Sequence, residues 1–216
     1  IVGLTAVTLI ADFAFFEGLK VGNPSVVGVI SASFVAISVI ISVLFLGEHL
    51  TLERALAVVT ILSGVILCLL DGRTLRFAWG RGETMALITM LGWGVYYALI
   101  KIPIQAVGWF VPLYLFLLSF PIIGLVLFRK MPLQSPLPKT IFPAFLASVL
   151  LTSLAEWLYV ISIETSDVSF VAPIAGSYPA LFVLLSSFVF REPMHRMQWL
   201  GVGMTLIGII FLSMKG

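Results

Sequence analysis

Charged residues are scarce in this sequence. Asp, Glu, Lys and Arg make up only 10% of its 216 residues, whereas 61% are hydrophobic. Soluble globular domains have about 25% charged and about 45–50% apolar residues. The net charge of +2 is also too small to indicate binding to nucleic acid. The composition therefore excludes an ordinary soluble domain and indicates a membrane protein.

Cysteine and histidine are scarce as well. The single cysteine, Cys68, lies in an apolar run, so it cannot form an internal disulfide and is interpreted as a small core residue. His49 and His195 have no Cys or further His at ligand spacing, so no metal site is predicted. The sequence also lacks His-Glu-x-x-His, Gly-x-Ser-x-Gly, Walker and cofactor fingerprints, so neither an enzyme nor a cofactor is expected.

Long apolar runs are abundant, and their ends are marked by charge, Gly and Pro. Each run has about 20 residues, which is enough for a helix to cross a bilayer core of about 30 Å. The predicted fold is an all-α integral membrane protein with eight transmembrane helices. These spans lie near Ile1–Leu19, Ser25–Leu46, Leu52–Leu70, Met85–Ile104, Phe110–Phe128, Ile141–Ser162, Ser169–Phe190 and Trp199–Met214.

The chain contains an internal repeat. Residues 11–72 can be laid on residues 155–216 without a gap, with position 12 falling on position 156, a shift of 144 positions. About a quarter of the overlaid positions are identical, as expected for a duplicated membrane unit. Matched pairs include Asp12 with Glu156, Ser33 with Ser177, Glu48 with Glu192, and Gly64 with Gly208. Duplication of this kind is typical of secondary transporters.

The order of the spans predicts an inverted repeat. The first three spans match the sixth, seventh and eighth, and a shift of an odd number of spans makes matching helices cross the membrane in opposite directions. The repeat unit is then five helices, and the parent protein is expected to have about ten in a 5+5 arrangement. Residues 1–72 are predicted to be the last three helices of the first repeat, its first two being missing. Residues 73–216 are predicted to be a complete second repeat. The start at Ile1, without Met, favours a fragment.

Basic residues gather on one side of the predicted spans. The connections after the first, third, fifth and seventh spans carry Lys20, Arg73, Arg76, Arg81, Arg129, Lys130, Lys139, Arg191 and Arg196. The positive-inside rule places these connections in the cytoplasm, so both ends of the chain are expected outside. The expected location is the plasma membrane.

Each copy also carries a recognisable motif. The first reads Leu46-Gly47-Glu48-His49-Leu50-Thr51, followed by Ser63-Gly64-Val65. The second reads Phe190-Arg191-Glu192-Pro193, followed by Gln198-Trp199-Leu200-Gly201 and Gly208-Ile209-Ile210. These motifs resemble EamA-type repeats of the drug/metabolite transporter superfamily over the whole chain.

The resemblance implies a ten-helix transporter with a central cavity, which works by alternating access on small metabolites, often by export or proton exchange. It also implies cytoplasmic ends, which is opposite to the charge distribution. The first copy departs from the second because it lacks counterparts of Pro173 and Pro179.

Asp12 and Glu156 form the sharpest candidate site. They lie within apolar spans at equivalent positions of the two copies. A carboxylate at membrane depth is costly and usually faces a polar cavity or a partner. The pair is predicted to face a central cavity and to serve in proton coupling or cation binding. The alternative is that either residue lies near a helix end and reaches headgroups or a basic residue.

The seventh span contains a second candidate. Pro173 and Pro179 flank Gly176, Ser177 and Tyr178, and proline removes backbone hydrogen bonds from a helix. Broken helices often line the substrate site of transporters, so Ser177, Tyr178 and the matched Ser33 are expected to line the cavity. A packing kink with no ligand is the alternative.

The fourth span carries a polar face. Trp93, Tyr97 and Lys101 follow one another at intervals of four residues. They are interpreted either as a cavity wall that binds an amphipathic or anionic cargo, or as interfacial anchors with Lys101 extended to the headgroups.

The remaining acids have local interpretations. Glu48 and Glu192 are each expected to cap the helix that follows them. Glu17 is expected to pair with Lys20 on the same helical face.

The function predicted from these features is a secondary active transporter of small metabolites. A non-transporting structural or partner-binding membrane subunit is the alternative, and a polar cavity containing Asp12 or Glu156 would distinguish the two. The expected partners are a small-molecule substrate, the lipid bilayer and protons, with no nucleic acid. The cargo and the oligomeric state, a homodimer included, are left open.

Overall fold

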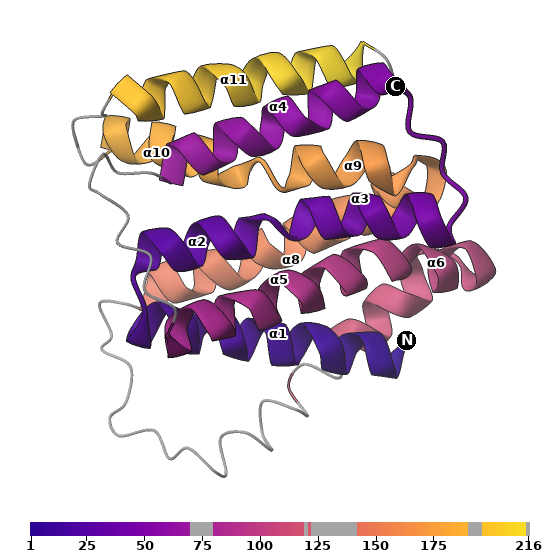
Figure 1. Ribbon diagram of the computed structural model, residues 1–216. Coiled ribbons are helices and arrows are strands. Elements are labelled where there is room, and N and C mark those ends of the chain that lie inside the picture. The colour runs from indigo at the N-terminus through magenta and orange to yellow at the C-terminus, as the bar shows by residue number, and fades with distance from the viewer. Residues whose placement is uncertain (70–79, 119–120, 122–141, 190–195, 215–216) are drawn as a thin grey trace.

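The computed structural model describes residues 1–69, 80–118, 121, 142–189 and 196–214, and the regular structure in these ranges is helical (Figure 1). The helices are α1 (Val2–Val21), α2 (Pro24–Ala32), α3 (Phe34–Phe45), α4 (Leu52–Leu69), α5 (Arg81–Leu99), α6 (Lys101–Val107), α8 (Phe142–Thr165), α9 (Val168–Ala175), α10 (Tyr178–Val189) and α11 (Arg196–Ser213). The all-α prediction is therefore confirmed for the described part of the chain.

Several of these helices are long and apolar enough to cross a membrane. Within the described residues they are Val2–Val21, Val26–Phe45, Arg81–Val107, Leu146–Thr165 and Arg196–Ser213. Of the predicted fifth span, Phe110–Phe128, residues 110–118 and 121 are described and helical, and the rest lies outside the described residues. The structure thus supports a multi-pass membrane protein, while the count of eight spans and the 5+5 arrangement stay predictions.

The second and seventh predicted spans are both broken, at equivalent positions. Ser33 separates α2 from α3, and Gly176-Ser177 separates α9 from α10. At each break the serine N–H donates to a carbonyl three residues back, with N···O distances of 3.2 Å for Ser33–Ile30 and 3.2 Å for Ser177–Ile174. The serine hydroxyls also donate to carbonyls of the preceding turn, a bond that is known to bend helices. The prolines are therefore not required for the break, since the first copy has none there.

The equivalent helices α4 and α11 lie side by side (Figure 1). Gly64 of α4 lies against Gly201 and Thr205 of α11. The equivalent Gly208 lies against Ala57 and Ile61, which are the counterparts of Gly201 and Thr205. Because contacts are exchanged in this reciprocal way, and residue numbers rise in opposite directions, the two helices pack antiparallel about a local pseudo-twofold axis.

Gly64→Ala is expected to lower the free energy of unfolding by about 1–3 kcal/mol, the usual cost of overpacking. A Cβ at Gly64 would lie 2.4 Å from Thr205 Oγ1 and 2.7 Å from the Gly201 carbonyl oxygen, which cannot move aside without separating the helices. Thermal unfolding in detergent measures the loss. The matched control is Gly203→Ala on α11, where a Cβ meets nothing within 4 Å. Equal stabilities of the two variants would contradict this account of the packing.

Helix α5 lies between α1 and α3 and contacts both through glycines. A Cβ at Gly92 would lie 2.7 Å from Ala11 Cβ, and a Cβ at Gly94 would lie 2.5 Å from Ile37 Cβ. The Thr89 hydroxyl donates to the Ala11 carbonyl at 3.1 Å, and the Ser38 hydroxyl donates to the Gly94 carbonyl at 3.2 Å. These close contacts hold the middle of α5 against both neighbours.

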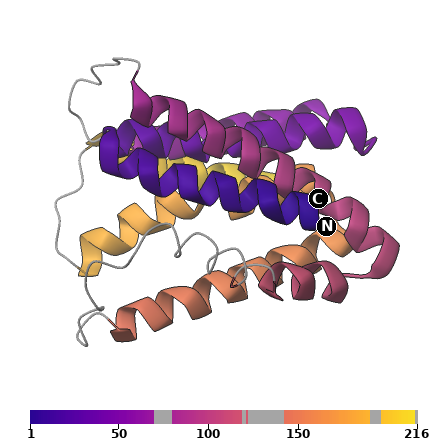
Figure 2. The ribbon, with the colours of Figure 1, turned by 90° about the horizontal axis from the view of Figure 1, so that it is seen from below.

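Helix α8 lies at an edge of the bundle (Figure 2). It exposes a row of large apolar side chains, namely Phe142, Leu146, Val149, Leu150, Leu151, Leu154, Trp157 and Leu158. Such a face is suited to lipid or to another transmembrane helix.

Candidate functional site

Three hydrogen-bond donors on α5 and α6 each bind a carboxyl group from another element. Trp93 Nε1 donates to Asp12 Oδ1 at 2.8 Å, and the Tyr97 hydroxyl donates to Glu156 Oε1 at 2.5 Å. Lys101 Nζ donates to Glu48 Oε1 at 2.9 Å. We call Trp93, Tyr97 and Lys101 the donor stripe. Its members follow one another at intervals of four residues, so each lies about 6 Å further along the helix axis than the last.

Asp12 is held by the packing of α1 on α5. Its neighbour Ala11 lies against Gly92 and accepts the Thr89 hydrogen bond, which places Asp12 beside the next residue of α5, Trp93. The Trp93 ring also contacts two phenylalanine rings, with centroids 5.1 Å from Phe15 and 5.8 Å from Phe34. We call the contacting rings of Phe15, Phe34, Trp93 and Tyr97 the aromatic wall. The Trp93 N–H is the hydrogen-bond donor that this wall offers to Asp12.

Glu156 is held on the same stripe from the other side, by α8. Its Oε1 accepts from Tyr97, and the Tyr159 hydroxyl donates to the Tyr97 carbonyl at 2.7 Å. Its second oxygen, Oε2, is buried and accepts no hydrogen bond from the residues that the structure describes. Leaving a polar group buried without a hydrogen bond is costly, so this oxygen is suited to a proton or to a ligand.

Hydrogen bonds bring Asp12 and Glu156 together with Trp93 and Tyr97. The predicted cavity serines, in contrast, bond within their own helices. The hydroxyls of Ser33 and Ser177 donate to carbonyls of their own helices. Tyr178 begins α10 and is 49% exposed.

The two helix breaks nevertheless lie close to the grouped residues. Phe34, next to the first break, contacts the rings of Trp93 and Tyr97, with centroids 5.8 Å and 5.3 Å away. A Cβ at Gly176, beside the second break, would lie 3.6 Å from Phe34 Cζ and would overlap Val35. The two breaks therefore meet behind the aromatic wall.

Glu48 caps a helix, but the expectation that it caps the following helix was wrong. Its Oε1 accepts from the Val168 N–H at 2.7 Å, and its Oε2 accepts from the Ser169 N–H at 2.9 Å. These residues begin α9, in the other copy, where a negative charge complements the helix dipole. The equivalent acid, Glu192, lies outside the described residues.

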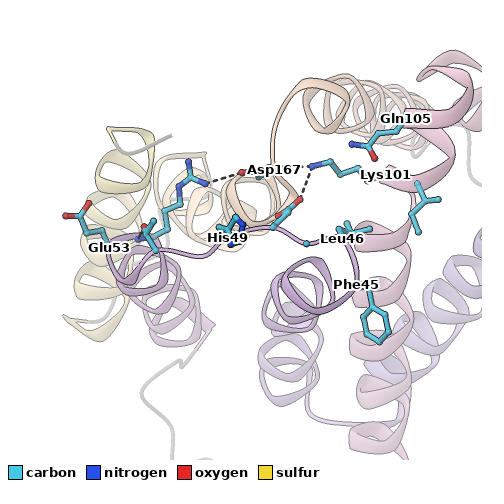
Figure 3. Close-up of a pocket in the computed structure, with 12 residues that line it drawn as sticks. Phe45, Leu46, His49, Glu53, Lys101, Gln105 and Asp167 are labelled. Carbon is cyan, nitrogen blue, oxygen red and sulfur yellow. Dashed lines mark hydrogen bonds and ion pairs between the residues drawn. The ribbon is translucent and has the colours of Figure 1, made fainter.

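Lys101 is buried rather than extended to the headgroups. It is 7% exposed, and besides Glu48 it contacts the Ser166 carbonyl at 3.0 Å and Asp167 at 3.7 Å. Asp167 in turn pairs with Arg54 at 3.1 Å. Ion pairs link Glu48, Lys101, Asp167 and Arg54 into a charge cluster. Figure 3 labels Lys101 and Asp167 of this cluster.

The charge cluster opens into a pocket of about 790 Å³. The other lining residues include Phe45, His49, Glu53 and Gln105 (Figure 3). Neither Asp12 nor Glu156 lines this pocket, so the cavity expected around those two carboxyls stays a prediction.

Glu48 titrates below the usual range of a carboxyl group. Burial alone would raise its pKa, but the hydrogen bonds from Lys101, Ser169 and Val168 outweigh burial and hold the pKa below the ordinary value of 4.5. Glu48 therefore carries a negative charge at neutral pH. This network could not be anticipated from sequence spacing, because its members come from turns that lie far apart in the chain.

At the opposite end, Glu17 does not form the expected pair with Lys20. It pairs instead with Arg81 at 3.0 Å, which joins the end of α1 to the start of α5.

A curated protein and a solved structure are similar to this chain. The chain is 36% identical over 75 residues to the uncharacterized protein y4nH of Sinorhizobium fredii (strain NBRC 101917 / NGR234). That match spans 34% of this chain and 64% of the relative. A solved crystal structure, described only as that of a protein, superposes with a TM-score of 0.84 over 98% of this chain and 74% of its own. Its sequence identity of 17% makes this a likeness of fold alone.

A family model provides the assignment. The model of the EamA-like transporter family matches residues 1–70 and 80–214, which is nearly the whole chain. The multi-pass helical fold and the family match agree with each other. The chain belongs to the EamA-like transporter family.

Proposed function

We propose that this protein is a secondary active transporter that exports small metabolites across the plasma membrane by alternating access. The observation that carries the proposal is the pair of membrane-embedded carboxyls, Asp12 and Glu156. They come from different helices and are bound to donors four residues apart on α5. An ionisable residue inside a membrane span is costly and is typical of ion or substrate pathways.

The geometry suits an exchange of protons for cargo. Trp93 and Tyr97 each donate to one oxygen of a carboxyl, and donation of this kind holds the group in place in either protonation state. The buried second oxygen of Glu156 is then the atom that gains or loses the proton. A neutral carboxylic acid is cheaper to enclose than a carboxylate, so a closed state favours protonation, whereas a cation or an amine on the cargo can replace the proton.

In this proposal, the rocking of the two halves takes place at the breaks in the second and seventh spans. Ser33 and Ser177 interrupt two spans at the depth of the aromatic wall, and short segments on either side of a break can tilt separately. Ser33, Ser177 and Tyr178 are proposed to face the cargo in a state in which the halves have rocked apart.

The function is tested by transport in liposomes. The protein, expressed from its complete reading frame, is reconstituted in vesicles that contain the pH-sensitive dye pyranine. Amino acids, nucleosides and sugar phosphates are then added one at a time under a pH gradient. We expect at least one class to change the internal pH above the rate in protein-free vesicles. If no compound moves protons or is itself accumulated as a labelled solute, the alternative of a structural or partner-binding subunit is favoured.

A further inference from the structure

The charge cluster joins the two copies at one end of the bundle. Glu48 and Arg54 belong to the first copy, and Lys101 and Asp167 belong to the second. Both ion pairs, Glu48–Lys101 at 2.9 Å and Arg54–Asp167 at 3.1 Å, therefore cross from one copy to the other. Any motion that separates the copies at this end must break them.

The inner part of the cluster also anchors a broken helix. Glu48 accepts from the first two N–H groups of α9, the short helix that ends at the break near Gly176. Lys101 is the last member of the donor stripe and begins α6, which follows the helix that carries Trp93 and Tyr97. The cluster is thus connected to the helix that binds Asp12 and Glu156 and to the segment that a rocking motion must move.

At the opposite end of the repeat, the two positions equivalent to the outer ion pair carry uncharged residues. With the shift of 144 positions, Arg54 corresponds to Gln198 and Asp167 corresponds to Asn23. An ion pair on one side is therefore matched by two neutral amides on the other. Charged hydrogen bonds are roughly twice as strong as neutral ones, so the Arg54–Asp167 pair has no counterpart of equal strength at the equivalent positions.

We propose that the charge cluster is a latch between the two copies, which closes this end of the transporter and biases the protein toward the state seen here. The proposal rests on the proposed transport function. To open this end, the linker between α3 and α4 must separate from the N-terminus of α9, which breaks the hydrogen bonds to Glu48. The Arg54–Asp167 ion pair, which is partly exposed, must break as well. A fully buried inner pair is only weakly sensitive to salt, whereas the outer pair is screened by it.

The latch is tested by measuring a distance across this end. Nitroxide labels are placed at Leu52→Cys on α4 and Thr165→Cys on α8, which are both exposed, in a Cys68→Ala background. Electron–electron resonance then gives the distance distribution in detergent and in nanodiscs. The test variant is Arg54→Gln with Asp167→Asn, which gives this end the residues of the other copy. The control is Arg81→Gln, which removes the Glu17 ion pair at the opposite end.

We expect the test variant to increase the population at longer distance about two- to fivefold, the change that follows from loss of a partly exposed ion pair. In the unmodified latch, raising the salt concentration to about 1 M should produce a similar shift, because charges are then screened beyond about 3 Å. At low salt the control should keep the parental distribution, and its intact latch should still shift when the salt concentration is raised. Identical distributions for the test variant and the parent would overturn the proposal.

This measurement needs no cargo, so it separates the latch from the transport function. A salt-dependent opening in a protein that moves no solute would support the latch and contradict the proposed function. Proton-coupled transport with an unchanged distance distribution would support the function and contradict the latch.

Discussion

Glu156→Gln is expected to abolish pH-gradient-driven transport while the protein still folds and inserts. Glutamine keeps the oxygen that accepts from Tyr97 but cannot bind and release a proton at the buried second position. Removal of a group that must change its charge in every cycle is expected to lower the coupled rate by at least about 100-fold, within the range found for proton-transfer groups. The pyranine assay measures this rate, with any cargo identified by the screen described above.

Two comparisons make this result specific. Glu164→Gln removes an exposed carboxyl from the same helix, α8, and should transport at the parental rate. Asp12→Asn removes the other carboxyl of the pair, and at least one of the two site variants should keep exchange or binding after it loses proton coupling. If Glu156→Gln and Asp12→Asn both transport at the parental rate with an unchanged pH dependence, the carboxyls are structural and the proposed coupling site is wrong.

From the sequence, Asp12 and Glu156 could be expected to need polar partners, and Trp93 and Tyr97 could be expected to share one helical face, because both expectations rest on local rules. A carboxyl inside an apolar run must find a partner, and donors four residues apart share one face of a helix. What the sequence left open was which acid meets which donor, since Trp93 lies 81 positions from Asp12 and Tyr97 lies 59 positions from Glu156. That pairing depends on the contact of α1 with α5 through Ala11 and Gly92.

The role of Glu48 shows where local reasoning fails. An acid just before a helix is usually expected to cap that helix, because the N–H groups are near in sequence. Here the α3–α4 linker passes beside the start of α9, and Glu48 meets N–H groups 120 and 121 positions away. For Lys101, local spacing likewise leaves two interpretations open, a cavity wall or extension to the headgroups, because its partner is a buried carboxylate 53 positions away.

The helix breaks show a third kind of limit. Pro173 and Pro179 marked the seventh span as interrupted, but the second span carries only a serine at the corresponding place and is broken in the same way. A serine within an apolar span is a weak signal, since it usually bonds to its own helix without ending it. The repeat itself was the better guide, because a break in one copy indicates a break in the other.

Lys101→Met is expected to cause a large loss of stability. It leaves the Glu48 carboxylate buried without its cation, and breaking a buried ion pair from one side costs about 3–5 kcal/mol. The double variant Lys101→Met with Glu48→Gln should recover much of this loss, because a neutral side chain needs no cation and can still accept from an α9 N–H group. Arg81→Gln, which breaks an exposed pair, should change the stability by no more than about 1 kcal/mol.

The pH dependence of thermal unfolding in detergent distinguishes this charge effect from a simple packing defect. The pKa of Glu48 is lowered in the folded protein, so its stabilising contribution is complete above the ordinary carboxyl value of 4.5 and is lost as the pH falls through the lowered value. In Lys101→Met the carboxylate lacks its cation, and protonation relieves the variant while it weakens the parent. The deficit should therefore be largest at neutral pH and should shrink on acidification. Arg54, His49 and Glu53 also line the pocket, but they are the same in both proteins and cancel in the difference. Asp167 also loses its 3.7 Å contact with Lys101, so the comparison is repeated in an Asp167→Asn background. A deficit that stays constant down to about pH 4 would show that Lys101 acts through packing and not through the charge of Glu48.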